Sequence, residues 1–133
     1  MTLYHLILSL VACIVAFVLV RPLLFAGLRI APAVAQQKIQ AGEAVLVDVR
    51  EPSEWRTGVA GPAVLLPASD LLGERRKWKP FLAANKDKEL ILYCASGIRS
   101  GNAAMILRKE GRKTANLGGL GRWRDLGLPM RKV

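Results

Sequence analysis

Cysteine is scarce in this 133-residue chain, which contains only Cys13 and Cys94. Cys13 lies inside a long apolar run near the N-terminus, so the two thiols are poorly placed to pair, and a disulfide framework is excluded. Internal repeats and low-complexity segments are also absent, and the length suits one domain with an appendage. Cys94 is therefore a lone thiol in the globular part, and its presence there needs a chemical reason.

Charge is absent from the first 20 residues. Residues 3–20 form an apolar run that only a tyrosine, a histidine and a serine interrupt. Because a bilayer core requires about 20 apolar residues in a helix, the run predicts a transmembrane helix. We assign residues 1–28 to this anchor and a short linker, and residues 29–133 to a single folded domain.

Two other identities for the apolar run remain open. An A-x-A pattern at residues 33–35 can mimic a signal-peptidase site, although a signal peptide begins with Lys or Arg and none precedes this run. A buried core helix is the third reading. Arg21, Arg29 and Lys38 follow the run closely, so the positive-inside rule predicts a single-pass membrane protein with a cytoplasmic domain.

The formal net charge of +10 belongs entirely to the part after the apolar run. Such a charge suits attraction to anionic lipid headgroups or anionic substrates, and it also suits a plainly solvated basic surface. The densest basic cluster, at residues 75–79, has no aromatic ladder beside it. We therefore expect no nucleic-acid partner.

Short apolar runs alternate with helical segments through residues 29–133. The apolar runs predict strands at 44–47, 63–66, 89–93 and 114–117. Helices are expected at 32–40, 51–55, 70–84, 101–109 and 120–128, with Ser69 or Asp70 capping the third and Ser100 the fourth. This alternation predicts an α/β fold with a small parallel sheet flanked by helices.

The segment around Cys94 carries the chemistry. It lies between a buried strand and a helix, where parallel sheets bind ligands and helix N-termini present unpaired N–H groups. A loop wrapped around that point forms an anion nest, in which a cysteine loses its proton more readily. We therefore predict that Cys94, on a solvent-facing loop, is the nucleophile. Gly97 in this loop is free to adopt positive φ, and Arg99 supplies a cation beside it. The alternative is that Cys94 is a buried cysteine with a purely structural role as a small apolar side chain.

Four segments, in order and spacing, resemble the rhodanese family. They are VLVDVREPSEW at 45–55, RTGVAGPAVLLP at 56–67, the CASGIRS segment at 94–100, and NLGGLGRWRDLGLPM at 116–130. RIAPAVAQQKIQAG at 29–42 is similar to the opening strand and helix of the family. One departure is Val59, which stands where such families often carry a histidine after the first glycine.

The resemblance implies a sulfurtransferase that requires no metal and no organic cofactor. Cys94 would take a sulfur from a small anionic donor such as thiosulfate, and a thiol or cyanide would remove it. The backbone amides of the implied binding residues would hold the persulfide, and Arg99 would bind the donor. These residues are Ala95, Ser96, Gly97, Ile98 and Arg99. Asp48, Arg50, Trp55 and Trp123 are expected to be structural rather than catalytic.

Two rival functions use the same cysteine. A phosphatase or arsenate reductase on this fold has five residues between its cysteine and arginine, whereas four separate Cys94 from Arg99 here. The shorter loop makes a smaller cradle, which favours sulfur over phosphate. The other rival is a relay module that exchanges sulfur with a protein partner at the membrane. The residues specify neither the physiological donor and acceptor nor the oligomeric state.

Overall fold

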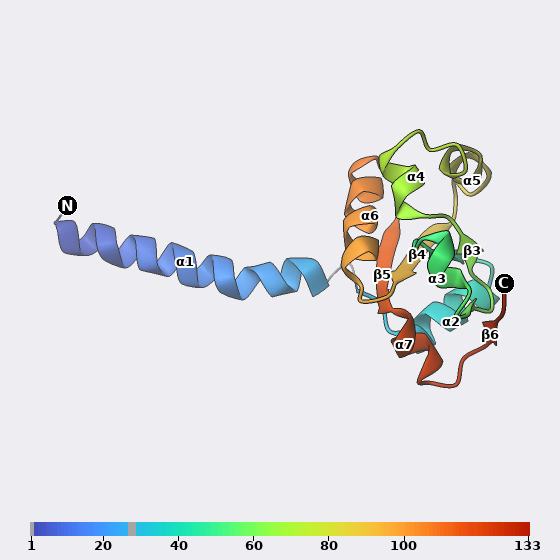
Figure 1. Cartoon of the computed structure of the whole chain (residues 1–133). Coiled ribbons are helices and arrows are strands. Elements are labelled where there is room, and N and C mark those ends of the chain that lie inside the picture. Colours follow the sequence, from blue (N-terminus) through green and yellow to red (C-terminus); the bar gives the residue numbers. More distant parts are fainter. Residues whose placement is uncertain (1, 27–28) are drawn as a thin grey trace.

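Helix α1 (Leu3–Ala26) extends away from the folded domain in the computed structural model, which describes residues 2–26 and 29–133 (Figure 1). None of residues 3–20 is buried, so the core-helix reading is wrong. The helix is long and apolar enough to cross a membrane, a test that an N-terminal signal sequence also passes. The predicted boundary at residue 28 lies outside the described residues.

The domain is built on four parallel strands in the order β3–β1–β4–β5, which confirms the predicted sheet. The strands are β1 (Ala44–Asp48), β3 (Val64–Leu65), β4 (Glu89–Cys94) and β5 (Thr114–Gly119). Strand β4 is buried along its whole length because it has a neighbour on each edge and helices on both faces. Its last residue, Cys94, therefore lies at the centre of the carboxyl edge of the sheet.

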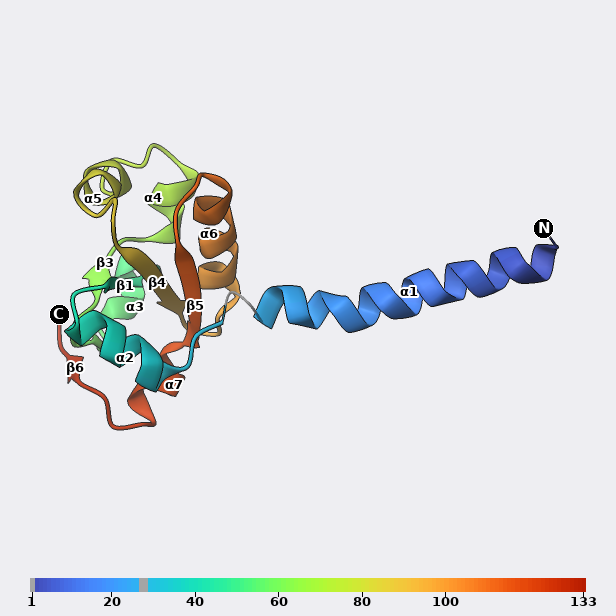
Figure 2. The ribbon, with the colours of Figure 1, turned by 180° about the vertical axis from the view of Figure 1, so that it is seen from behind.

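Side chains of β4 alternate between two cores, as the period of a strand requires. Ile91 and Tyr93 face the core under α2 (Pro32–Gln40) and α7 (Leu120–Arg124), and Figure 2 shows α2 lying across that side of the sheet. Leu90, Leu92 and Cys94 face the core under the helices α4, α5 and α6. The bounds of these helices are Ala68–Leu72 for α4, Trp78–Ala84 for α5 and Ile98–Lys109 for α6. The thiol thus points toward α6.

The prediction of a single helix over residues 70–84 is wrong, because α4 and α5 are two separate helices. Helix α4 ends, and the connection to α5 passes through Arg75, a non-glycine residue with a φ of 56°. Neither Ser69 nor Asp70 caps α4, whose N-cap is Pro67. The Asp70 carboxylate instead accepts hydrogen bonds from the backbone N–H groups of Arg76, Lys77 and Trp78, at the start of α5.

Helix α6 begins at Ile98 rather than at residue 101, so Ser100 lies inside the helix and does not cap it. The N-cap is Gly97, whose φ of 95° lies in the left-handed region that glycine adopts at little cost. Helix α3 (Pro52–Trp55) forms where expected, and Glu51 and Glu54 close a capping box around it.

An antiparallel pair that the sequence pattern did not predict joins two distant segments. Strand β2 (Val59–Ala60) pairs with β6 (Met130–Arg131) near the C-terminus, and α7 ends at Arg124 rather than at residue 128. Two-residue strands are too short to show a period of two. Val59 is fully buried in this pair, so the position where the family often has a histidine belongs to the core here.

Candidate active site at the end of strand β4

Cys94 is completely buried, and the expectation of a solvent-facing position is wrong. Its sulfur accepts a hydrogen bond from the backbone N–H of Gly97 at 3.0 Å, and the Ser100 hydroxyl lies 3.4 Å from it. The Cys94 loop (residues 94–99) therefore folds back over its own first residue. The exposed residues Ala95, Ser96 and Ile98 form its outer surface, and Arg99 is half-buried.

Two opposing effects set the pKa of the Cys94 thiol. Burial raises this pKa because it disfavours the charged thiolate. Hydrogen bonds from the Ser100 hydroxyl and from the backbone N–H groups of Ser100, Gly97 and Ser96 lower it by more. The pKa of Cys94 is thus below its ordinary value of 9.0, in the direction expected for a thiol inside an anion nest.

Glycines let the end of β5 pack directly beneath the loop. A Cβ on Gly97 would approach the Cα of Gly118 to 3.0 Å, and a Cβ on Gly119 would lie 2.5 Å from the carbonyl oxygen of Ala95. The second distance is impossible for a real side chain. The lack of a side chain at Gly97 and at Gly119 therefore permits this close backbone approach.

Asn116 is a buried residue of β5 that sequence reasoning missed. Its side-chain amide donates to the carbonyl oxygen of Gly97 at 3.0 Å. Its carbonyl oxygen accepts from the Ser100 hydroxyl at 2.8 Å and from the backbone N–H of Gly118 at 3.0 Å. One side chain thus ties the loop, α6 and the end of β5 together. The available signal was an amide side chain between the apolar residues Ala115 and Leu117 of the predicted strand.

Arg99 is engaged by a second residue that the sequence did not identify. Its guanidinium donates two hydrogen bonds to the carboxylate of Glu54, at 2.6 and 2.9 Å. The hydrogen bond from Arg99 lowers the pKa of Glu54 to about 2, so this carboxylate stays ionised. The pKa of Arg99 is raised, first by its hydrogen bond to Glu54 and also by the neighbouring Cys94. Arg99, the cation predicted to bind a sulfur donor, is therefore already paired with Glu54 of the same chain.

Asp48 and Arg50 form a buried ion pair at the end of β1, with Nη2 and Oδ2 2.9 Å apart. The Arg50 guanidinium also donates to the carbonyl oxygens of Glu54, at 3.3 Å, and Gly58, at 2.7 Å. The pair thus fixes the segment that carries Glu54, which supports the structural role expected for both residues. Trp55 and Trp123 are buried in the domain, as expected.

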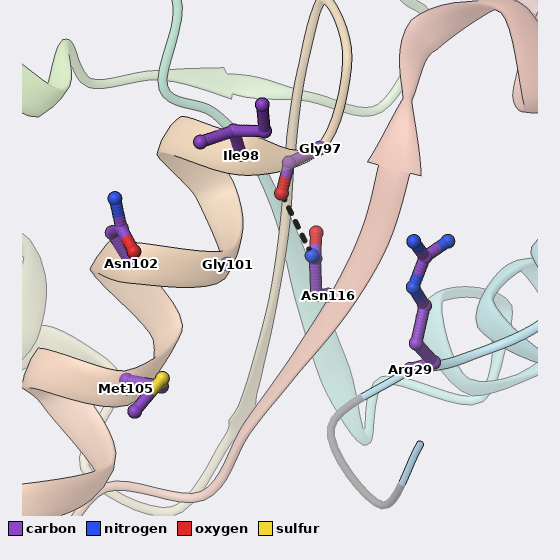
Figure 3. A pocket seen from close by; sticks show the side chains of 7 residues that line it. All are labelled: Arg29, Gly97, Ile98, Gly101, Asn102, Met105 and Asn116. Atoms are coloured by element: carbon purple, nitrogen blue, oxygen red, sulfur yellow. Dashed lines mark hydrogen bonds between the residues drawn. The ribbon is translucent and has the colours of Figure 1, made fainter. Parts of the chain in front are cut away.

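A pocket of about 290 Å³ opens beside the Cys94 loop, between α6 and β5 (Figure 3). Its lining residues are Arg29, Gly97, Ile98, Gly101, Asn102, Met105 and Asn116. Within residues 2–26 and 29–133, no group of three or more His, Cys, Asp or Glu side chains is arranged to hold a metal ion.

Together these features define an α/β protein whose central parallel strand delivers a cysteine into a ring of backbone amides. The family described as the Rhodanese-like domain matches residues 31–126. The chain therefore belongs to the rhodanese-like family.

Relatives and solved structures agree with this assignment. A protein named Sulfurtransferase from Allochromatium vinosum is 33% identical over 100 residues, which cover 74% of this chain and 88% of that protein. The uncharacterized protein YqhL of Bacillus subtilis is 36% identical over 99 residues, covering 71% and 74%. The crystal structure of a rhodanese-related protein from Thermoplasma volcanium superposes with a TM-score of 0.65 at 31% identity, covering 77% of this chain and 96% of that one.

Proposed function

We propose that this protein is a sulfurtransferase that carries sulfur as a persulfide on Cys94. The observation that carries the proposal is the hydrogen bond from the Gly97 N–H to the Cys94 sulfur, together with a pKa lowered by the surrounding donors. A thiolate is the attacking form of cysteine, and the same donors suit a persulfide anion one atom longer.

Thiosulfate is the donor we propose to test. The Cys94 thiolate attacks the outer sulfur, the S–S bond of thiosulfate breaks, and sulfite leaves with the electron pair. Cyanide or a thiolate then attacks the terminal sulfur of the persulfide, which releases thiocyanate or a new persulfide and restores the Cys94 thiolate. This is a covalent, two-step transfer that consumes no oxidant or reductant.

Intact mass of the purified chain tests the first step directly. With thiosulfate we expect one added sulfur atom, which cyanide then removes. The Cys94→Ser variant should gain none, because a hydroxyl cannot carry sulfur in this way, and Cys13→Ser should gain it normally. Sulfur transfer from thiosulfate to cyanide by Cys94→Ser would refute the proposal.

A relay role at the membrane is the second candidate, and the Arg99–Glu54 pair favours it. Because Glu54 already neutralises Arg99, a dianionic donor finds less free positive charge here than an unpaired arginine would offer. A persulfide on a protein donor carries a single negative charge, so it depends less on a free arginine than thiosulfate does. If an acceptor protein removes the Cys94 sulfur while cyanide does not, the relay role is the main one.

A further inference from the structure

Two arginine side chains converge on Gly118, beside the Cys94 loop. Measured from the position that a Cβ would occupy on Gly118, Nη1 of Arg122 lies at 3.3 Å and Nη1 of Arg29 at 3.5 Å. The two nitrogens are therefore at most about 7 Å apart, inside the Debye length of about 8 Å at physiological ionic strength. At this separation solvent ions screen their mutual repulsion only in part.

No carboxylate offsets this repulsion within the part of the chain that the structure describes. The Arg122 guanidinium donates to the carbonyl oxygen of Leu117 at 2.7 Å, and among the described residues neither Arg122 nor Arg29 has an ion-pair partner. Arg50 and Arg99 behave differently, since Arg50 pairs with an aspartate and Arg99 with a glutamate. Both unpaired side chains are exposed, so an outside ligand can reach them.

The backbone holds the two arginines in place. Arg29 bridges to Asn116 of β5, and the N–H of Ile30 donates to the Asn116 carbonyl oxygen at 3.1 Å. Arg122 is in the short helix that follows β5, and Gly118 has no side chain to separate the two cations. Figure 3 shows Arg29 across the pocket from α6, with Gly97 and Asn116 between them.

We propose that Arg29 and Arg122 form a binding site for a phosphate group. Guanidinium groups present paired N–H donors that match the oxygens of a phosphate, and its charge would offset their repulsion. Arg29 follows the apolar run 3–20 by only nine positions, which brings an anionic lipid headgroup within reach as well as a soluble phosphate. The site is independent of sulfur transfer, although Gly118 is in close contact with Gly97 of the loop.

The test uses the full chain in micelles of an uncharged detergent. Inorganic phosphate is added against chloride at equal ionic strength, and the amide resonances of Gly97 and Gly118 are followed by NMR. We expect a saturable shift with phosphate only. Arg29→Gln and Arg122→Gln should each weaken binding at least about tenfold, the effect of removing one hydrogen bond to a charged group. Arg122→Lys, which keeps the positive charge, should retain part of the phosphate affinity.

Arg124→Gln is the matched control, because Arg124 is an exposed arginine in the same helix whose nearest ion-pair partner is Asp125 at 4.0 Å. It should bind phosphate as the unchanged protein does. The remaining amide resonances report whether each variant is folded. Equal shifts with chloride and phosphate, or an unchanged affinity in the Arg29→Gln/Arg122→Gln double variant, would overturn the site.

Vesicles separate the two sources of phosphate. If lipid headgroups occupy the site, the Gly118 resonance should already be shifted in vesicles containing phosphatidylglycerol, and added phosphate should change nothing further there. If soluble phosphate is the ligand, titration should give a saturable shift in both phosphatidylglycerol and phosphatidylcholine vesicles, weaker in phosphatidylglycerol because its anionic surface repels phosphate. Either result supports the site, and absence of any shift in all three media contradicts it.

Discussion

At the scale of single residues, the chemistry of the site depends on how much charge each group keeps after burial. Cys94 is buried, which alone makes a thiolate costly, yet four donors reverse the outcome. Arg99 retains its charge but shares it with Glu54. The sulfur is therefore activated mainly by hydrogen bonds from its own loop and from Ser100, and long-range charge has a smaller part.

The reactivity of Cys94 should follow this balance. In a Cys13→Ser background, the rate of alkylation should rise with pH to a midpoint below 9.0, the ordinary value for the thiol. Ser100→Ala should move the midpoint upward, because it removes the hydroxyl that stabilises the thiolate. Thiosulfate should protect the thiol by forming the persulfide. A midpoint at or above 9.0 would show that burial outweighs the donors.

Arg99 should matter for anionic donors. Arg99→Ala should weaken the use of thiosulfate at least about tenfold, as expected when a charged hydrogen-bond donor is lost, and chiefly through KM. Arg99→Lys should restore it only in part, since the planar fork is lost. Steady-state kinetics with thiosulfate and cyanide provide the measurement, with the exposed Arg108 changed to Ala as the control. Unchanged kinetics in both Arg99 variants would remove this residue from the mechanism.

The Arg99–Glu54 pair should also make the free energy of unfolding depend on pH in the acid range, because Glu54 titrates there. Its pKa is lowered to about 2, from an ordinary value of 4.5, so its contribution to folding is complete above pH 4.5 and declines as the pH falls toward 2. In Glu54→Gln this loss should disappear from the free energy of unfolding measured across that range. Glu74→Gln, which removes a carboxylate from an exposed ion pair, should leave the acid dependence as it is. Identical acid profiles for both variants would argue against the pair.

At the scale of elements, the site depends on what holds the ends of β1, β4 and β5 in register. The buried Asp48–Arg50 pair fixes the segment after β1, and Asn116 fixes the loop after β4 to β5. Helix α6 begins at Ile98, directly after its N-cap Gly97, so only three residues lie between Cys94 and the helix. These contacts link segments that are far apart in sequence.

Removing one partner of the buried pair should be costly. Asp48→Asn leaves the Arg50 guanidinium buried with an incomplete partner, and we expect a loss of about 3–5 kcal/mol in the free energy of unfolding. Asp125→Asn, at the exposed and loosely paired Asp125, should change it by less than about 0.5 kcal/mol. Denaturant unfolding of the full chain in micelles, followed by tryptophan fluorescence, gives both values. Equal stability in the two variants would show that the Asp48–Arg50 pair is replaceable.

At the scale of the whole molecule, the distinctive element is α1, which extends away from the folded domain. Residues 3–20 are uncharged, apolar and unburied, which fits a membrane anchor and also a signal sequence. The positive residues that follow the run predict a cytoplasmic domain.

Fractionation distinguishes these possibilities. We expect the full chain to sediment with membranes and to resist an alkaline wash, and a truncation that begins near Ala26 to be soluble and folded. Protease added to intact cells should not reach the domain, and digestion from outside would reverse the predicted topology. An N-terminus near residue 36 in the mature protein would instead identify a cleaved signal sequence.

The sequence alone determined the class of fold and the position of the cysteine, because both depend on local patterns. Apolar runs of strand length, a glycine with free φ and a lone thiol between strand and helix are visible in a few neighbouring residues. The separation of α4 from α5, the β2–β6 pair and the burial of Cys94 were decided by tertiary packing. So were the roles of Glu54, Asn116 and Ser100, since each acts through a partner that the chain brings close only when the sheet forms.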